Sequence, residues 1–234
     1  MSNAKLKSFI TGESINLCVP TSEFALNSEW YNWVNRPENS RFLMGRGMFP
    51  NTPEDQLKFF EQEKDRRVLL IVEHKGEYIG VVSLSGVNHV TLSADLAIVI
   101  DGSRFPLETP FIALETAALM TTHGFETVGL KRIHSGQHVQ LKGWGQRKEL
   151  IGYRVEGILR NYFRRGTEVA DVISSAITIG DYQNIKELRG GKLWDSKEKM
   201  IARIAKLPRD KFFDQVNEFL ATTGGKYYDE VFKL

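Results

Sequence analysis

One carboxylate stands out because of the segment that carries it. Asp95 lies in ADLAIVI (residues 94–100), where every other side chain is apolar. A charged side chain on an apolar strand is costly unless it is paired or performs chemistry, and a carboxylate placed there can act as a general base. An exposed strand end accounts for Asp95 about as well as a catalytic role does. His89, His134 and His138 are the candidate partners for its charge.

The segment that follows Asp95 has the form of a phosphate-binding loop. DGSRFPLETPFIALE (residues 101–115) leads from the strand into a helix, and helix N-termini bind phosphate through free N–H groups. Its only glycine is Gly102, and Pro110 removes one N–H donor. Arg104 is the best phosphate partner nearby, although a solvated loop arginine would have the same sequence signature.

Metal and disulfide chemistry are not expected. No cluster of histidine, cysteine and acidic residues has the spacing of zinc ligands, so we predict no metal site. Cys18 is the single cysteine, which rules out an intramolecular disulfide. Its apolar surroundings, INLCVP, favour a core residue over a nucleophile.

The composition is that of an ordinary globular protein. Of its 234 residues 41% are hydrophobic, which is enough apolar material for a buried core. The net charge of +2 neither demands nor excludes nucleic acid. MSNAKLKSFITGES lacks the apolar core of a signal peptide, and no segment has membrane-spanning length. Together with the lone cysteine, these features predict a cytoplasmic protein without a membrane partner.

Hydrophobic periodicity and capping residues predict the elements that would position these groups. SEWYNWVNRPENSRF predicts a short helix that ends near Pro37, and Thr52 can cap a second helix in NTPEDQLKFFEQEKD. RRVLLIVEH and YIGVVSLSGV indicate a hairpin around KGE, and TLSADLAIVID indicates a buried central strand. A long helix, a strand, a short helix and an antiparallel pair follow in LETPFIALETAALMTTHGF, GLKRIHSGQHV, LKGWGQRKELIG, YRVEGILRNYF and EVADVISSAITI. The predicted order is strand, two helices, three strands, helix, strand, helix and two strands.

Residues 190–234 differ in character from residues 1–189, and we treat them as a helical C-terminal extension of one domain. WDSKEKMIARIAKL and PRDKFFDQVNEFLATT predict two amphipathic helices, the second beginning at Pro208 and ending at Gly224-Gly225. The second helix carries an apolar stripe formed by Phe212, Phe213, Val216, Phe219 and Leu220. We expect the extension to pack on the domain or on a second copy in a homodimer.

Taken together, these segments resemble the GNAT superfamily of acyl-CoA-dependent N-acetyltransferases, closest to the branch that acetylates ribosomal-protein N-termini, amino sugars and small amines. EWYNWVNRPENSRF and NTPEDQLKFF are similar to its first two helices, GEYIGVVSLSGVN to its hairpin and ADLAIVI to its central strand. ALETAALMTTHGFETVGLKRI is similar to its long helix and next strand, and GYRVEGILRNYFRRGTEVADVISSAI to its closing pair. The resemblance covers about residues 5–180. It implies an α/β (α+β) fold with a mixed, mostly antiparallel central sheet flanked by helices.

The resemblance also implies a cofactor and a catalytic base. Acetyl-CoA would be the co-substrate, bound along the central strand, and Asp95 would act as a base through water. Four residues of that strand are expected to contact acetyl-CoA: Ala97, Ile98, Val99 and Ile100.

The donor loop departs from the family pattern. That pattern is Gln or Arg, two residues, Gly, one residue, then Gly or Ala, and its fixed positions fall on Glu108, Phe111 and Ala113. Only Ala113 agrees with this pattern. We therefore expect two loop residues to contact the donor: Ala113, and Arg104 as the best phosphate partner nearby.

The acceptor side departs as well. The family's tyrosine, which protonates the leaving thiolate, falls on Lys148, and its asparagine falls within residues 137–140. The nearest tyrosines are Tyr153 and Tyr162, so no residue inherits the general-acid role cleanly.

Two functions therefore compete. The first is an acetyl-CoA-dependent N-acetyltransferase acting on a primary amine of a small molecule or peptide. The second is a GNAT-fold protein with a divergent donor loop that uses another acyl donor, modifies nucleic acid or acts as a non-catalytic binding module. We favour the first, because backbone contacts to a cofactor leave little trace in a sequence.

Overall fold

The computed structural model describes residues 5–234, and its strands form one eight-stranded sheet. The strand order is β1-β2-β3-β4-β5-β6-β8-β7; β5 and β6 are parallel and every other neighbouring pair is antiparallel. The strands are β1 (Ser8–Thr11), β2 (Ile15–Cys18), β3 (Val68–His74), β4 (Glu77–Asn88), β5 (Ser93–Ile100), β6 (Arg132–His138), β7 (Arg154–Arg165) and β8 (Glu168–Thr178). The predicted mixed, mostly antiparallel sheet is confirmed.

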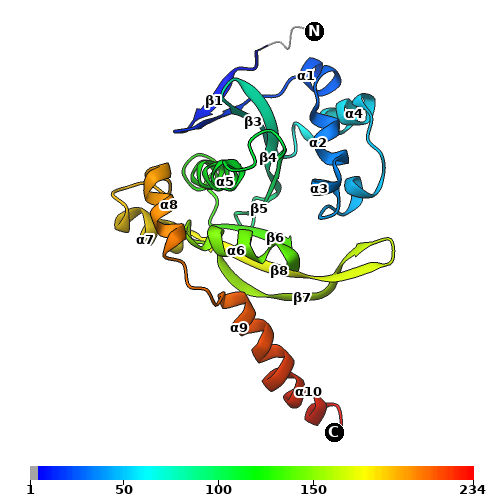
Figure 1. The fold of residues 1–234 in the computed structure, drawn as a ribbon, viewed down its shortest axis with the longest axis vertical. Coiled ribbons are helices and arrows are strands. Elements are labelled where there is room, and N and C mark those ends of the chain that lie inside the picture. Colours follow the sequence, from blue (N-terminus) through cyan, green and yellow to red (C-terminus); the bar gives the residue numbers. More distant parts are fainter. Residues whose placement is uncertain (1–4) are drawn as a thin grey trace.

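Helices cover both faces of the sheet (Figure 1). The helix α5 packs on one face, while α1, α2 and α4 pack on the other. The helices are α1 (Ser22–Asn27), α2 (Trp30–Asn35), α3 (Pro37–Ser40), α4 (Pro53–Glu63), α5 (Thr109–Glu126), α6 (Lys142–Glu149), α7 (Ile179–Leu188), α8 (Lys197–Ala205), α9 (Phe212–Phe219) and α10 (Gly225–Val231). Three shorter segments are η1 (Gly45–Met48), η2 (Val139–Leu141) and the π-helical η3 (Leu220–Gly224).

Alternation along the strands gives the sheet an apolar core on each side. In β3, Leu70 and Val72 belong to the core beneath α5, whereas Leu69 and Ile71 belong to the core beneath α1, α2 and α4. Successive side chains of a strand point to opposite faces, so one buried strand serves both cores. This explains why β3 is apolar over almost its whole length.

The sheet divides between β5 and β6. These two strands are paired only at residues 93–95 and 132–134. Beyond that point β5 continues beside β4 as far as Ile100, whereas β6 continues beside β8 as far as His138. The sheet therefore has an upper part (β1–β5) and a lower part (β6, β8 and β7) that are joined at one end (Figure 1).

Most predicted elements of the domain are present at the predicted places. Thr52 caps α4 by accepting a hydrogen bond from the Asp55 N–H, and the Asp55 side chain accepts one from the Thr52 N–H. The β3–β4 hairpin turns at Lys75 and Gly76, both at positive φ, where glycine is favoured. The long helix, the strand after it, the short helix and the closing antiparallel pair are confirmed as α5, β6, α6, β7 and β8.

The structure contains one strand and three α-helices that were not predicted, the helices being α1, α3 and α7. The chain begins with a hairpin of two strands, β1 and β2, where one strand was predicted. The first predicted helix is confirmed as α2, which ends before Pro37 because the residue before a proline avoids helical geometry, and a separate short helix, α3, begins at Pro37. After β8 the chain forms α7, which was not predicted, although Thr178 and Asp181 form a capping box at its start.

The first part of the C-terminal extension packs on the domain. Met200 of α8 is fully buried. The Trp194 indole N–H donates to the Glu13 carboxylate at 2.8 Å, which ties the extension to the β1–β2 turn. The predicted helix in WDSKEKMIARIAKL is confirmed as α8.

The last helix departs from the prediction in its bounds and in its packing. It begins at Phe212 and not at Pro208, whose carbonyl accepts a hydrogen bond from Gln146 of α6. The helix does not end at Gly224-Gly225, because the π-helical segment η3 joins α9 to α10. Its apolar stripe is not buried within the chain: Phe213 is 8% exposed, but Phe219 is 58% exposed.

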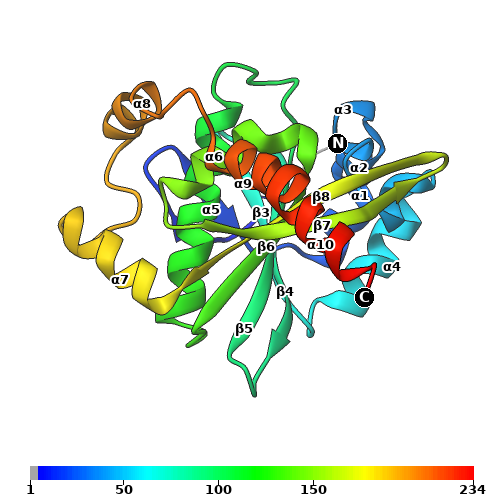
Figure 2. The ribbon, with the colours of Figure 1, turned by 90° about the horizontal axis from the view of Figure 1, so that it is seen from below.

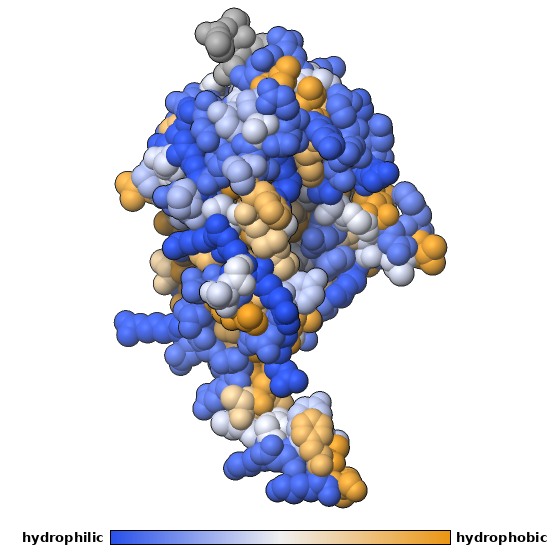
Figure 3. Space-filling view, turned by 90° about the vertical axis from the view of Figure 1, so that its right-hand side faces the viewer, coloured by the Kyte–Doolittle hydropathy of each residue, from blue (hydrophilic) through white to orange (hydrophobic). Residues whose placement is uncertain are grey.

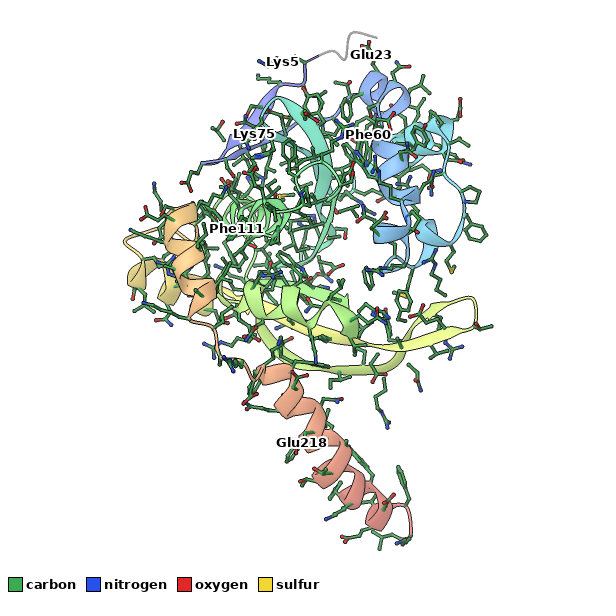
Figure 4. All side chains as sticks on the ribbon, viewed as in Figure 1. Lys5, Glu23, Phe60, Lys75, Phe111 and Glu218 are labelled. Atoms are coloured by element: carbon green, nitrogen blue, oxygen red, sulfur yellow. The ribbon has the colours of Figure 1, made fainter. Side chains whose placement is uncertain are left out.

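The helix formed by α9, η3 and α10 projects from the molecule (Figure 1) and carries apolar side chains on its surface (Figure 3). Glu218 lies on this projecting part (Figure 4). A second subunit covering the stripe therefore stays a prediction. Within residues 5–234 no helix combines the length and hydropathy needed to cross a membrane.

Candidate active site

A cleft opens where β5 and β6 separate, with a volume of about 570 Å³. Residues 95–100 of β5 and residues 134–138 of β6 line it. Its other walls come from α3 and the turn after it, from α6, and from β7 and β8. Seen from below, the β7–β8 pair runs across the molecule (Figure 2), and α6 packs against β6 and β8. Because two strand ends and a helix converge there, this cleft is the candidate active site.

Beyond Asp95, the edge of β5 that faces the cleft has no strand beside it among the described residues. All four predicted donor-contacting residues of this strand, Ala97, Ile98, Val99 and Ile100, line the cleft. They pair with β4 on one side, but no described strand pairs with the other side beyond Asp95. Alternate N–H and C=O groups on such an edge stay available for hydrogen bonds, and an extended, amide-rich ligand can bind there as a strand would.

Asp95 lies at the point where the two strands part. It is in register with His134, and the two side chains approach to 3.9 Å between Asp95 Oδ1 and His134 Nε2. Desolvation raises the pKa of Asp95, and the fields of His134 and Lys148 partly offset this rise. The carboxylate is still 43% exposed to the cleft, so water and ligands can reach it. A carboxylate with a raised pKa is a better proton acceptor than an ordinary aspartate.

The other two histidines do not contact Asp95. His89 lies in the turn between β4 and β5 and does not line the cleft. His138 lines it but is buried, with its ring edge-on to Phe163 at 4.6 Å between centroids. Its Nε2 lies 3.4 Å from a Glu168 carboxylate oxygen. The structure therefore brings only His134 of the three candidates to Asp95.

A buried lysine also lines the cleft. Lys148 of α6 is 1% exposed, and its Nζ donates to Ser135 Oγ of β6 at 2.9 Å and to Ser175 Oγ of β8 at 3.2 Å. Burial lowers the pKa of Lys148 to about 7, and the negative field of Asp95 opposes this lowering. The ammonium is thus held by neutral hydroxyl groups, in a part of the protein where a charge is costly.

The special position of this lysine was not predicted, although the sequence contains a signal for it. Leu141, Trp144 and Lys148 recur at spacings of three and four, and such spacings place residues on one face of a helix. Two of the three are apolar, so that face packs inward. A lysine on an inward face is a candidate for a perturbed pKa.

Gln137 contributes an amide without a protein partner. It lines the cleft at 6% exposure, and neither its Oε1 nor its Nε2 has a hydrogen-bond partner among the described residues. A side chain at Gly145 would displace the Gln137 amide, because its Cβ would lie 2.1 Å from Gln137 Nε2. A buried amide is costly without partners, so its polar atoms are available to a ligand in the cleft.

The N-terminus of α5 offers no free N–H group in its first turn, contrary to the expectation for a phosphate site. The Glu108 and Thr109 N–H groups donate to the Phe105 carbonyl at 3.0 and 2.8 Å. Pro110 has none to donate, and the Phe111 and Ile112 N–H groups donate to the Glu108 carbonyl at 2.9 and 3.0 Å. Carbonyl groups that precede the helix therefore accept the hydrogen bonds of the N–H groups that a phosphate would need.

The two loop residues expected to contact the donor lie outside the cleft. Arg104 donates to the Glu77 carboxylate at 2.5 Å and lies 3.8 Å from that of Asp101. Ala113 is half-buried and packs against the core beneath α5. Neither residue lines the cleft.

Glu108 is neutralised by two lysines. Its carboxylate accepts hydrogen bonds from Lys75 Nζ at 2.7 Å and Lys197 Nζ at 3.1 Å, which lower the pKa of Glu108 to about 2. Lys197 Nζ also lies 5.9 Å from the centre of the Phe111 ring, which extends from α5 toward α8 (Figure 4). Glu108 and Phe111 therefore serve the contact between α5, the β3–β4 hairpin and α8.

The part of the chain that the structure describes contains no group of three or more histidine, cysteine or acidic side chains that could hold a metal ion. The buried thiol of Cys18 has a pKa raised by desolvation to about 11. A thiol with a raised pKa is a poor nucleophile.

Comparisons with known proteins identify the fold. No protein-family model matches the chain, and no curated protein does. The microcin C7 self-immunity acetyltransferase MccE, solved with acetyl-CoA and AMP, is 20% identical, with a TM-score of 0.61 over 72% of this chain and 94% of that one. Mycobacterium smegmatis RimJ, solved with CoA-disulfide, is 18% identical, with a TM-score of 0.63 over 77% and 91%.

A third structure has a similar score. RimL, the ribosomal L7/L12 alpha-N-protein acetyltransferase, solved with coenzyme A, is 14% identical, with a TM-score of 0.64 over 75% of this chain and 99% of that one. Likeness at these identities is a likeness of fold. The chain has the GNAT acetyltransferase fold, as its sequence predicted.

Proposed function

We propose that the protein is an acetyl-CoA-dependent N-acetyltransferase that transfers an acetyl group to a primary amine by direct attack on the thioester. The observation that carries this proposal is the unpaired edge of β5 in a cleft that also holds Asp95. The edge supplies backbone groups for an amide-rich donor, and the carboxylate supplies a base. Both are needed for acyl transfer to an amine, and both lie in one cleft.

The proposed reaction assigns separate roles to backbone and side chain. The pantetheine amides of acetyl-CoA pair with the β5 edge at residues 97–100, which brings the thioester toward Asp95. The amine must lose a proton to attack, and Asp95 accepts it through a water molecule. A backbone N–H on the same edge stabilises the oxyanion that forms on the carbonyl. After the attack the nitrogen is positively charged, and it loses its second proton to solvent by the same route. The C–S bond then breaks, leaving an amide and a thiolate.

The acceptor is proposed to be a cationic amine of a small molecule or a peptide. Glu38 and Asp95 are the acidic side chains that line the cleft, and they attract an ammonium group before it is deprotonated. The similar structures include a spermidine N-acetyltransferase and a protein that acetylates an α-amino group. Spermidine and a short peptide with a free α-amino group are therefore the first two acceptors to test.

The test has a binding arm and a turnover arm. Calorimetric titration with acetyl-CoA should give saturable 1:1 binding, and binding to the native state should raise the melting temperature. Incubation with acetyl-CoA and each acceptor should release free thiol and form an acetylated amine visible by mass spectrometry. Absence of both binding and a melting shift at millimolar acetyl-CoA would contradict the proposal.

One observation favours the alternative function. The N–H groups of the first turn of α5 are already bonded within the loop, so the donor's phosphates find no helix N-terminus there. A GNAT-fold protein that uses a different acyl donor, modifies nucleic acid or only binds a ligand would need no such site. Binding of a shorter acyl thioester, acetyl-pantetheine, without binding of acetyl-CoA would support this alternative.

We also propose that residues 1–189 carry the active site and that residues 190–234 form a helical extension. The exposed stripe of α9 and α10 makes a homodimer the expected use of that extension. A cytoplasmic location, predicted from the sequence, belongs to the same proposal.

A further inference from the structure

Lys148 is a charged group that lines the cleft and is buried without an opposite charge in contact among the described residues. Its side chain lies between α6 and the β6–β8 pair, at 1% exposure. Such a lysine is costly for the fold. Lys148 also lines the cleft, so a ligand bound there would lie beside it. Stability of the fold alone does not require a lysine at this position.

One of the three N–H groups of the Lys148 ammonium has no acceptor among the described residues. A lysine ammonium has three N–H donors. Ser135 Oγ and Ser175 Oγ accept two of them, and Ser175 Oγ is itself fixed by donating to the Ser135 carbonyl at 3.1 Å. No third acceptor among the described residues is within hydrogen-bond distance of Nζ. A ligand group in the cleft can accept the third bond.

The surroundings set the protonation state of this group. Asp95 on β5 is the charged side chain whose field acts on Lys148, and it favours the ammonium. His134 on β6 pairs with Asp95. The Tyr153 ring lies 5.1 Å from Nζ, and burial raises the pKa of its hydroxyl, which bonds to Thr121 of α5, so Tyr153 stays neutral. β8 contributes only a serine hydroxyl.

Burial prevails over the field of Asp95, and the pKa of Lys148 is lowered to about 7. At neutral pH the ammonium and the amine are both well populated. The group can therefore give up a proton and regain it from solvent within one reaction cycle, which an ordinary lysine with a pKa near 10.4 does poorly.

We propose that Lys148 is the proton donor to the thiolate that leaves when the acetyl group is transferred. The inference rests on the proposed N-acetyltransferase function. As the C–S bond breaks, its electron pair goes to sulfur, and the Lys148 ammonium transfers one proton to that thiolate to give the free thiol. The two protons that the ammonium acceptor loses pass through Asp95 to solvent, and the neutral Lys148 takes one proton back, so one proton is released in each cycle.

The direction of this transfer is favourable. A thiol has a pKa of about 8.5, so an ammonium with a pKa about 1.5 units lower protonates its thiolate with an equilibrium constant of roughly 30. The neutral amine left behind keeps its hydrogen bonds to the two serines. No charge then stays buried beside the product.

Three variants of Lys148 separate proton donation from charge. Lys148→Met should lower the rate at neutral pH about 10²-fold or more, as expected for loss of a general acid. Lys148→Arg keeps the positive charge but cannot release a proton at neutral pH, so it should be as slow as Lys148→Met. Lys148→Tyr supplies a phenol with a pKa of about 10, so it should restore part of the rate and move the alkaline limb of the pH profile upward.

The readout is the rate of thioester loss with spermidine as the acceptor, measured over a pH range from about 5.5 to about 10.5, which brackets the ordinary pKa values of a thiol and a phenol. For the unchanged protein the rate should fall as the pH rises above about 7, because the donor must be protonated. Lys142→Met on the same helix is the matched control, since Lys142 is exposed and pairs with Asp214 at 2.9 Å. It should keep the rate and the pH profile of the unchanged protein.

Folding and donor binding are measured for each variant by thermal melting and by calorimetry with acetyl-CoA. A slow variant that melts cooperatively and binds acetyl-CoA supports the proposal. A Lys148→Met protein with an unchanged rate and alkaline limb would overturn the proton-donor role while leaving the N-acetyltransferase function standing. Full activity of Lys148→Arg would overturn it as well, in favour of a purely electrostatic role. If the unchanged protein neither binds acetyl-CoA nor consumes the thioester, the proposed function and this inference fail together.

Discussion

Two backbone regions of this fold could hold an acyl donor, and they differ in what they leave unbonded. Along β5, the strand edge beyond Asp95 has no described strand beside it and lines the cleft. At the N-terminus of α5, the N–H groups of the first turn are bonded to carbonyls of Phe105 and Glu108.

From this difference we infer that the proposed donor is recognised at the strand edge and not at the helix end. A strand edge recognises amides, whereas a helix N-terminus recognises phosphate. We therefore expect changes along β5 to have large effects on donor binding and changes in the loop before α5 to have small ones.

The largest effect is expected from filling the cleft beside β5. Ala97 is exposed in the cleft, and in Ala97→Trp the indole would occupy the space along the strand edge. We expect acetyl-CoA affinity, measured by calorimetry, to fall about 100-fold or more, a loss of about 2.7 kcal/mol. Ala202→Trp, at an exposed position of α8, is the control and should bind as the unchanged protein does. Unchanged affinity of Ala97→Trp would mean that the donor does not lie along β5.

The next effect concerns the base at the inner end of the same edge. Asp95→Asn should lower turnover about 10²-fold and change acetyl-CoA affinity by less than about threefold, since the amide keeps the shape of the carboxylate. Desolvation raises the pKa of Asp95, so the rate of the unchanged protein should rise as the pH climbs through that raised value and the base loses its proton. The variant should lack this acid limb. If the variant turns over as fast as the unchanged protein, Asp95 is not the base and its role is structural only.

A smaller effect is expected at the helix end. Phe111→Gly should lower the free energy of unfolding by about 1 kcal/mol or more, because glycine is a poor helix former and the ring packs against the core beneath α5. Acetyl-CoA affinity should stay the same, since removing the ring frees no N–H group. Tenfold tighter binding would contradict this expectation and show that the ring alone blocks a phosphate site.

The smallest effect is expected at Arg104. Its guanidinium pairs with Glu77 and Asp101 outside the cleft, and exposed ion pairs contribute about 0–1 kcal/mol. Arg104→Ala should therefore change acetyl-CoA affinity less than about threefold in calorimetry. A tenfold loss would mean that the loop rearranges when the donor binds and brings Arg104 to its phosphates.

The fold was predictable because its signals are local. The capping pair Thr52 and Asp55, the turn at Lys75-Gly76 and the apolar run of β5 each depend on a few adjacent residues. Apart from α7, whose capping box at Thr178 and Asp181 is itself a local signal, the elements that were missed are short or are continued by unusual geometry. β1 and β2 have four residues each, and η3 carries the last helix past Gly224.

The site was less predictable because it depends on contacts between distant segments. The sequence predicted that Asp95 and β5 belong to the site. It did not predict that the N–H groups at the start of α5 are hydrogen-bonded within the loop, because this depends on the orientation of the Phe105 carbonyl, which no residue type encodes. Lys148 becomes unusual only when Ser135 and Ser175 of two other elements enclose it. Their roles in binding and catalysis stay predictions.

The burial of Lys148 also couples protein folding to proton uptake. In the unfolded chain this lysine has its ordinary pKa of 10.5, whereas in the folded protein its pKa is about 7. Between these pH values unfolding takes up a proton, so the free energy of unfolding increases as the pH rises across this window. Across the whole window the free energy of unfolding increases by roughly 5 kcal/mol. Below the window the folded and the unfolded protein both carry the proton on Lys148, so the folded state bears the full cost of the buried charge. A protein built in this way is less stable at the pH where its buried lysine can exchange protons than in mildly alkaline solution.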